Sequence, residues 1–177
     1  MKDQTKTFKK LERTLEIWKI GLDDYDMNAL LKKQDKDSLS LGQVYVHLIQ
    51  ATLGYHLRQV EKCLNSSEHS NKKKNFKGFI TYNILGSIPP IKVKVPPSDA
   101  YTPKQPVSKE EIFKGLEKVE VRMKSWKDKM GQPGQGKTPH PGFSYLNGDE
   151  WYQLAEMHFR HHLRQKKRID DFLKAER

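Results

Sequence analysis

Apolar side chains in the first part of the chain recur every three or four residues, which is the period of an amphipathic helix. In the segment 4–20 they stand at Phe8, Leu11, Leu15 and Trp18. Gly21, followed shortly by two aspartates, is a suitable stop for such a helix. The pattern therefore predicts a helix over 4–20 and a shorter helix or turn within 26–34.

Three further helices are predicted from capping pairs, in which a Ser or Asn and a Gln or Glu three residues later satisfy free amides at a helix start. The pairs are Ser40 with Gln43, Ser108 with Glu111, and Asn147 with Glu150. Each pair is followed by an apolar stripe of helical period. These stripes extend the helices to about residue 64, to the Gly-Pro run at 131–134, and to residue 172.

The segment 65–107 does not fit this pattern. It opens with polar and basic residues, and prolines at 89, 90, 96, 97, 103 and 106 exclude a long helix. The run 91–95 alternates like a short strand without an obvious pairing partner, and 134–146 is predicted to be a loop. We therefore predict an all-α fold in one domain spanning 1–177. The expected architecture is a four-helix bundle with a long Pro-rich crossover at 65–107, packed over one end of the bundle.

Composition narrows the class of protein. Charged residues make up 31% of the chain and apolar residues 35%, which fits amphipathic helices with well-solvated outer faces. The single cysteine, Cys63, can form no intrachain disulfide. Neither a signal peptide nor a run of about 18 apolar residues is found. We therefore expect a soluble, cytoplasmic protein with no membrane partner, in which Cys63 is a small buried side chain.

Histidines form the most chemically informative pattern. His158 and His162 stand one turn apart in the last predicted helix, so their rings point in nearly the same direction, about 6 Å apart along the axis. A third metal ligand has to come from another helix. His47 is the best candidate because it lies on an apolar stripe, where an unsatisfied imidazole is costly. Three imidazoles predict a divalent transition metal with open coordination positions for water or substrate.

Several neighbouring side chains have two interpretations at this level. His161 is expected to border the predicted site, whereas His140 either supports that site from the loop before the last helix or is solvated. Gln165, one turn beyond the histidine pair, orients a ligand or fills the end of the bundle. His56 and His69 are expected at the surface. No carboxylate base is identified, so catalytic residues stay unassigned.

The net charge of +11 raises a competing interpretation, a basic nucleic-acid-binding protein. No nucleic-acid motif is found, however, and the basic run 166–168 fits a solvated helix face near a C-terminus, where the helix dipole favours cations. We therefore do not expect nucleic acid to be the partner. A non-catalytic metal-binding or ligand-binding bundle with the same histidines is a second alternative.

Three motifs resemble those of the DinB/YfiT-like superfamily. The stretch 156–165, Glu-Met-His-Phe-Arg-His-His-Leu-Arg-Gln, resembles the last-helix motif, in which His-x-x-x-His is followed three residues later by Gln. The stretch 38–48 resembles the second-helix motif, which leads to a metal-binding histidine, and 140–151 resembles the run before the last helix in one branch of the family. The motifs occur in the family's order and, with the helices, cover most of the chain.

The resemblance implies an up-down-down-up four-helix bundle and a nickel or zinc site with His47, His158 and His162 as ligands. It also implies a metal-dependent transferase or hydrolase, in which a low-molecular-weight thiol or water is activated to attack a small-molecule substrate. Relatives often form homodimers, so a homodimer is a further expectation. This chain departs from the family pattern at Leu39, where an aromatic residue is usual, and in its long Pro-rich insert.

Overall fold

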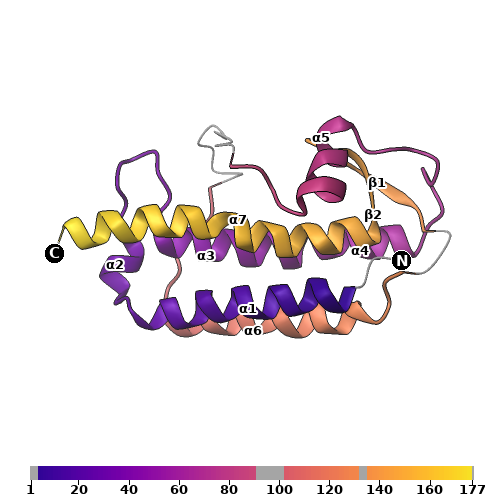
Figure 1. The fold of residues 1–177 in the computed structure, drawn as a ribbon. Coiled ribbons are helices and arrows are strands. Elements are labelled where there is room, and N and C mark those ends of the chain that lie inside the picture. The colour runs from indigo at the N-terminus through magenta and orange to yellow at the C-terminus, as the bar shows by residue number, and fades with distance from the viewer. Residues whose placement is uncertain (1–3, 91–101, 132–134, 177) are drawn as a thin grey trace.

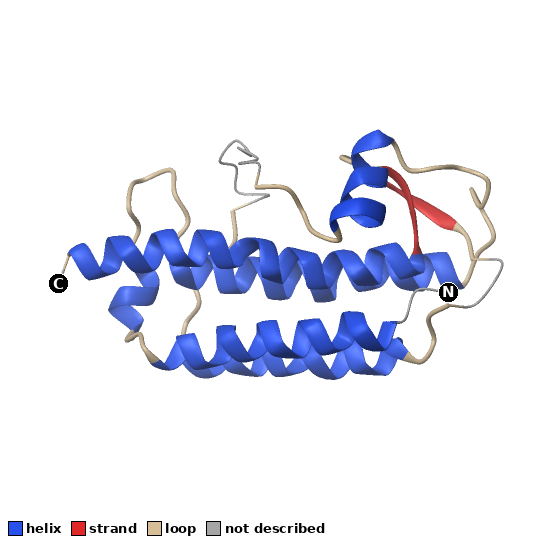
Figure 2. Ribbon diagram, viewed as in Figure 1, coloured by secondary structure: helices blue, strands red, loops and turns tan. Residues whose placement is uncertain are grey.

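The computed structural model describes residues 4–90, 102–131 and 135–176, and these are mostly helical (Figures 1 and 2). The long helices lie side by side: α1 (Gln4–Asp23), α6 (Lys109–Lys127), α7 (Gly148–Ala175), and a continuous run of α3 (Leu41–Gln50), the π-helical segment η1 (Ala51–His56) and α4 (Leu57–Leu64). A short helix, α2 (Met27–Leu31), joins α1 to α3. The helices predicted from the apolar stripes are thus present. None of the described helices is both long and apolar enough to cross a bilayer.

The apolar faces of the long helices pack on one another. Helices α1 and α3 each contact both α6 and α7, and α4 contacts α7. Trp18 and Tyr45 are fully buried, and the hydroxyl of Tyr45 donates to the carbonyl oxygen of Trp18 at 2.8 Å. The indole of Trp18 donates to the carbonyl oxygen of Phe159 at 3.3 Å. These aromatic side chains therefore fix α1, α3 and α7 relative to one another while their own polar atoms stay paired.

Two of the three predicted capping boxes form completely. The boxes at the starts of α3 and α7, with their reciprocal bonds, involve Ser40 with Gln43 and Asn147 with Glu150. At the start of α6 only half of the box forms, because Ser108 Oγ accepts from the amide of Glu111 at 3.1 Å. The Glu111 carboxylate accepts instead from the amide of Val107 at 2.9 Å. The prediction of a complete box at this helix is therefore wrong, although the helix start itself is confirmed.

The predicted second helix is confirmed in extent but is not a uniform α-helix. Its turns widen to π geometry over η1, immediately after the turn that carries His47. This change brings His56 into the interior, where only 6% of the residue is exposed. The expectation that His56 lies at the surface is therefore wrong, whereas His69 is exposed as expected.

A two-stranded hairpin stands where a loop was predicted. Strands β1 (Lys137–His140) and β2 (Ser144–Asn147) pair antiparallel, with His140 opposite Ser144. Pro139 takes part in β1 although it has no backbone N–H group to donate. A strand that pairs along one edge only tolerates proline, because the other edge needs no donor. The hairpin leads directly into α7, and Asn147 is both the last residue of β2 and the N-cap of that helix.

The segment after α4 contains short helices that were not predicted, because the prolines of this segment exclude only a long helix. Helix α5 (Phe76–Phe79) continues into the π-helical segment η2 (Ile80–Leu85). Asn75 fastens this segment to the hairpin, since its amide donates to the carbonyl oxygen of Phe143 at 3.0 Å. Figure 1 shows α5 and η2 beside the hairpin, near the start of α7. The predicted strand-like run 91–95 lies outside the described residues.

The basic run near the end of α7 is only partly solvated. Lys167 and Arg168 are exposed, but Lys166 is buried, with its ammonium 3.0 Å from the Tyr25 hydroxyl and 2.9 Å from Asp170 Oδ2. The expectation that all of 166–168 forms a solvated face is therefore wrong for Lys166. Its ion pair and hydrogen bond supply the partners that a buried ammonium requires.

Candidate metal centre

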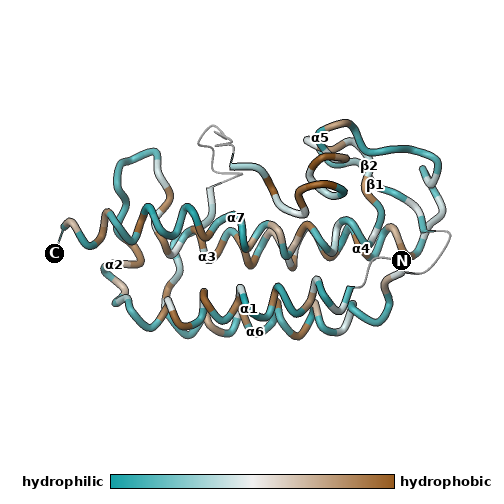
Figure 3. Tube along the Cα trace, in the orientation of Figure 1, coloured by the Kyte–Doolittle hydropathy of each residue, from teal (hydrophilic) through white to brown (hydrophobic). Residues whose placement is uncertain are grey.

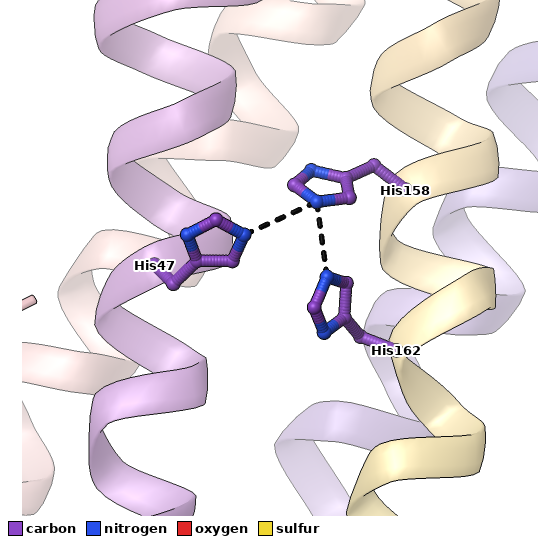
Figure 4. A group of neighbouring side chains, drawn as sticks. All are labelled: His47, His158 and His162. Atoms are coloured by element: carbon purple, nitrogen blue, oxygen red, sulfur yellow. Dashed lines mark hydrogen bonds between the residues drawn. The ribbon is translucent and has the colours of Figure 1, made fainter. Parts of the chain in front are cut away.

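Three histidine rings from two helices converge on one point (Figure 4). His47 comes from α3, and His158 and His162 come from α7; together they are called the histidine triad below. Nε2 of His158 lies 3.2 Å from Nε2 of His47 and 3.0 Å from Nε2 of His162. The potential ligand atoms of all three lie within 4.8 Å of one another. The structure thus brings together the side chains that the sequence analysis selected.

The local structure explains this convergence. A spacing of four residues on α7 stacks His158 and His162 on one face, with ring centroids 4.7 Å apart. His47 lies between Val44 and Leu48, which are both fully buried, so its side of α3 is the side that packs inward. Because α3 contacts α7, this places the ring of His47 opposite the other two.

The hydrogen atoms in the triad are constrained by Gln165. Nδ1 of His162 lies 2.8 Å from Oε1 of Gln165, and that oxygen can only accept. Nδ1 of His162 therefore carries the hydrogen, and its Nε2 presents a lone pair towards Nε2 of His158. Gln165 thus orients one ring of the triad, the role that was left open for it at the sequence level.

The triad is kept neutral by its surroundings. Burial lowers the pKa of His47. Burial, with repulsion from His47 as a smaller cause, lowers the pKa of His162 to about 4. Burial lowers the pKa of His158 well below the usual value, and repulsion from His56 adds to this effect. Neutral imidazoles are the form that binds a metal ion, so these rings do not have to lose a proton near neutral pH before they can bind one.

The triad cannot satisfy its own hydrogen-bonding groups. A hydrogen on Nε2 of His158 serves at most one of its two neighbours, and a lone pair there faces the lone pair of His162. Nδ1 of His158 is also buried and has no hydrogen-bond partner among the described residues. A cation at the common point would accept all three lone pairs at once.

The spacing of the rings fits such a cation. Metal–nitrogen bonds of ~2.0–2.1 Å place ligand atoms about 3.3 Å apart in a tetrahedral site and about 3.0 Å apart in an octahedral one. The two separations that involve Nε2 of His158, 3.0 Å and 3.2 Å, agree with these values. The set of three ligating residues contains no carboxylate, so its chemistry favours metals that prefer imidazole.

An aromatic wall that includes His56 stands beside the triad. The ring of His56 meets that of His158 edge-on, with centroids 5.3 Å apart. Trp151, fully buried, lies 6.1 Å from His56 and 5.3 Å from Tyr55 between ring centroids. Burial, with smaller effects of His140 and His47, lowers the pKa of His56 to about 3. Sequence reasoning missed His56 because a uniform helical period turns it away from α7.

The two other histidines proposed as neighbours of the site lie on its margins. The ring centroid of His161 is 5.5 Å from that of His162, and His161 also interacts with the backbone of Ile88. His140 stacks on Phe143 at 4.6 Å and lies 5.2 Å from Trp151, so it belongs to the aromatic wall rather than to the triad. Burial lowers the pKa of His140 to about 4.

Cys63 and a nearby surface groove lie apart from the triad. A groove of about 770 Å³ is lined by residues of α4, of the loop 65–69 and of β1, and none of the triad lines it. Cys63 is buried as expected, and burial raises the pKa of its thiol. A buried thiol with a raised pKa is a poor nucleophile, so Cys63 offers no catalytic thiolate.

Comparisons with models of known protein families, with curated proteins and with solved structures give no match.

Proposed function

We propose that this protein is a metal-dependent enzyme of the DinB/YfiT-like type, in which His47, His158 and His162 hold a divalent ion, zinc or nickel. The observation that carries the proposal is the approach of three neutral Nε2 atoms to one point. The separations between these atoms, which are close to those around a bound metal, also support it.

The proposed architecture is the up-down-down-up four-helix bundle of that superfamily. The course of the chain in Figure 1 supports this connectivity, since α1 and α7 run from right to left, and α3–α4 and α6 from left to right. The contacts of α1 and α3 with both α6 and α7 agree with such a bundle. In this arrangement the triad joins α3 to α7 through the middle of the molecule.

The proposed reaction is group transfer or hydrolysis with a low-molecular-weight thiol or water as the nucleophile. A divalent ion on three imidazoles lowers the pKa of a bound water or thiol and stabilises the resulting anion. Neighbouring residues fix the orientation of the histidine rings and limit the access of solvent to them. Gln165 fixes the hydrogen of His162, and the aromatic wall of His56 and Trp151 shields one side of His158 from solvent.

The metal site is tested by elemental analysis of protein purified without a His-tag, after incubation with zinc or nickel and removal of the excess. We expect about one ion per chain in the parent and loss of that ion in the double variant His158→Ala/His162→Ala. The matched control is His69→Ala, which removes an exposed histidine and should keep the parent's metal content. Equal metal in the parent and the double variant would contradict the site.

Catalysis is tested separately from binding. The loaded protein is incubated with small thiols and electrophilic substrates, and with hydrolysable esters and amides, and product is followed with and without a chelator. We expect turnover that depends on the metal and is absent from the double variant. Stoichiometric metal without turnover on any such substrate would support the alternative, a non-catalytic metal-binding bundle.

A further inference from the structure

Large apolar side chains are exposed together on α5 and η2. Phe76 is 77% exposed, Ile84 62%, Leu85 50% and Phe79 49%. Figure 3 shows apolar colouring on this part of the chain, which lies outside the long helices. Apolar side chains scattered singly over a surface are ordinary, but the exposure of four of them within the short segment 76–85 favours a place of contact with another molecule.

The exposure of these side chains is built into the fold. The opposite side of the segment is anchored, since Gly78, Thr81 and Tyr82 are buried. The end of η2 is held to α7, because Arg160 donates to the carbonyl oxygen of Gly86 at 2.7 Å and pairs with the buried carboxylate of Glu156. A segment held so firmly by one side presents its other side to solvent in a fixed orientation.

Lysines accompany the exposed apolar side chains. Lys72, Lys73 and Lys77 are exposed, and no ion pair of the described residues involves them. The neighbouring Lys74, by contrast, forms an ion pair with Glu150. These free lysines and the four exposed apolar side chains make up the surface called the α5–η2 surface below. It combines positive charge with apolar groups, the combination found at protein surfaces that bind anionic lipid.

We propose that the α5–η2 surface binds reversibly to an anionic membrane surface. The exposed apolar side chains enter the boundary between headgroups and acyl chains, while the lysines contact the lipid headgroups. This inference is independent of the metal site, and it revises the expectation of no membrane partner that the lack of a spanning segment suggested. A protein can bind the surface of a bilayer without a membrane-spanning segment, provided that it exposes positively charged and apolar side chains together.

Two observations favour lipid over other polyanions and partners. Phe76 and Phe79 could stack on bases, but the other two exposed apolar side chains, Ile84 and Leu85, are aliphatic and could not take part in an aromatic platform for single-stranded nucleic acid. The surface also projects from the molecule, as α5 and η2 stand out above α7 in Figure 1. A projecting apolar surface suits insertion into a lipid boundary, whereas a protein partner would need a matching groove.

Binding is measured by co-sedimentation of the full chain with vesicles at about 0.1 M salt, where the Debye length is ~10 Å. One set of vesicles contains phosphatidylcholine and phosphatidylserine at about 7:3, and the other contains phosphatidylcholine alone. We expect binding to the anionic vesicles, at least tenfold weaker binding to the neutral ones, and weakening as the salt concentration rises.

Two double variants separate the apolar and electrostatic contributions. Lys73→Glu/Lys77→Glu should weaken binding by more than about 25-fold, since each lysine near an anionic surface contributes about fivefold and the new carboxylates repel the lipid. Phe76→Ser/Ile84→Ser, at two largely exposed positions, should weaken binding at least tenfold without changing the thermal midpoint of unfolding.

Matched controls make the same changes on the long helices. Ile17→Ser/Val121→Ser alters exposed apolar residues of α1 and α6, and Lys114→Glu/Lys118→Glu alters exposed lysines of α6. Both controls should bind vesicles within about twofold of the parent. If Lys114→Glu/Lys118→Glu weakens binding as much as Lys73→Glu/Lys77→Glu does, the overall positive charge is responsible and the proposal is wrong. If Ile17→Ser/Val121→Ser weakens binding as much as Phe76→Ser/Ile84→Ser does, the apolar contact is not specific to the α5–η2 surface and the proposal is also wrong.

Other outcomes also overturn the proposal. Absence of binding to anionic vesicles rejects it directly. Tighter binding to a single-stranded oligonucleotide than to the vesicles, lost in the same α5–η2 variants, would assign the surface to nucleic acid. Self-association that rises with protein concentration in light scattering and disappears in Phe76→Ser/Ile84→Ser would assign it to a second copy of the chain.

Discussion

His162 and its partner Gln165 show how much of the candidate site depends on single atoms. The carboxamide oxygen of Gln165 leaves Nδ1 of His162 as a donor and turns the lone pair of Nε2 towards the other rings. The sequence predicted both residues from their spacing on one helix face, but it left two roles open for Gln165. The distance of 2.8 Å supports the orienting role.

Removal of this carboxamide should weaken metal binding. In Gln165→Ala the ring of His162 loses its fixed hydrogen position, and we expect zinc or nickel affinity to fall about 10–100-fold. Competition with a chromogenic chelator measures this change. The control is Gln50→Ala, which removes an exposed glutamine from α3, the helix that carries His47 and packs on α7. This variant should leave the affinity unchanged. Equal affinities of Gln165→Ala and the parent would show that Gln165 only fills space.

His56 marks the limit of prediction at the level of single residues. His56 is nine positions after His47, and at about 100° per residue a uniform α-helix places the two on opposite sides. The wider turns of η1 rotate His56 back towards α7, where its ring meets that of His158. The sequence contains no clear signal for a π-helical segment, which is rare and occurs mostly as a single turn within an α-helix.

The elements themselves followed from the sequence where a strong periodicity was present. The long helices and the short α2 stand where apolar spacing and capping residues predicted them. The β1–β2 hairpin was missed because Pro139, Pro141 and Gly142 resemble a loop, and four-residue strands are too short to show an alternating pattern. The half-formed capping box at α6 shows that the pairing of Glu111 is decided by the backbone that precedes the helix.

Two glycines in helices should respond oppositely to alanine. A Cβ at Gly54, in η1, would meet nothing within 4 Å, whereas one at Gly21 would lie 2.7 Å from Cε of the buried Lys166. Gly54→Ala should raise the free energy of unfolding by about 0.5–1 kcal/mol, because alanine loses less backbone entropy on folding. Gly21→Ala should lower it by about 1–3 kcal/mol, because Lys166 is held by Tyr25 and Asp170. Urea unfolding of both variants measures the contrast, and stabilisation by Gly21→Ala would contradict the packing described for Lys166.

Over the whole molecule, histidines that are buried (His56) or half-buried (His140 and His162) make stability depend on pH. Burial lowers the pKa of His56 to about 3 and those of His140 and His162 to about 4. Between the unfolded value of about 6.5 and these values, the unfolded chain binds protons that the folded protein does not. The free energy of unfolding of the metal-free protein should therefore fall as pH falls below 6.5.

The expected slope is up to about 1.4 kcal/mol per pH unit for each of these three histidines between pH 6.5 and about 5, above the range in which most carboxylates titrate. Urea unfolding in the presence of a chelator measures it. His56→Phe, which keeps an aromatic ring in the wall, should reduce the slope, whereas His69→Ala should not. A stability that is constant across this range would show that the histidines are not buried in solution.

Metal should stabilise the folded protein as a whole, because the triad joins two helices that are distant in the sequence. At a free metal concentration about 100 times the dissociation constant, binding adds about 2.7 kcal/mol, or a rise of about 5–10 °C in the thermal midpoint. Scanning fluorimetry of the parent and of His158→Ala/His162→Ala, each with and without zinc, measures the effect. A similar rise in the double variant would point to binding elsewhere.

The sequence by itself determined which segments are helical, which faces of them are apolar, and which histidines share a face, because these properties depend on spacing within one helix. The packing of α3 on α7 decided that His47 meets His158 and His162, and it also drew His56 inward through η1. Only the tertiary structure could settle the burial of Lys166 and the exposure of Phe76 and Ile84, since burial depends on which distant element covers a side chain.

The proposed function depends on one physical condition: three neutral imidazole nitrogens from two helices, α3 and α7, face one point, and the hydrogen atoms available there cannot pair all of their lone pairs. Spacing along the chain could select the rings, but the distances between them come from helix packing, which no local pattern encodes.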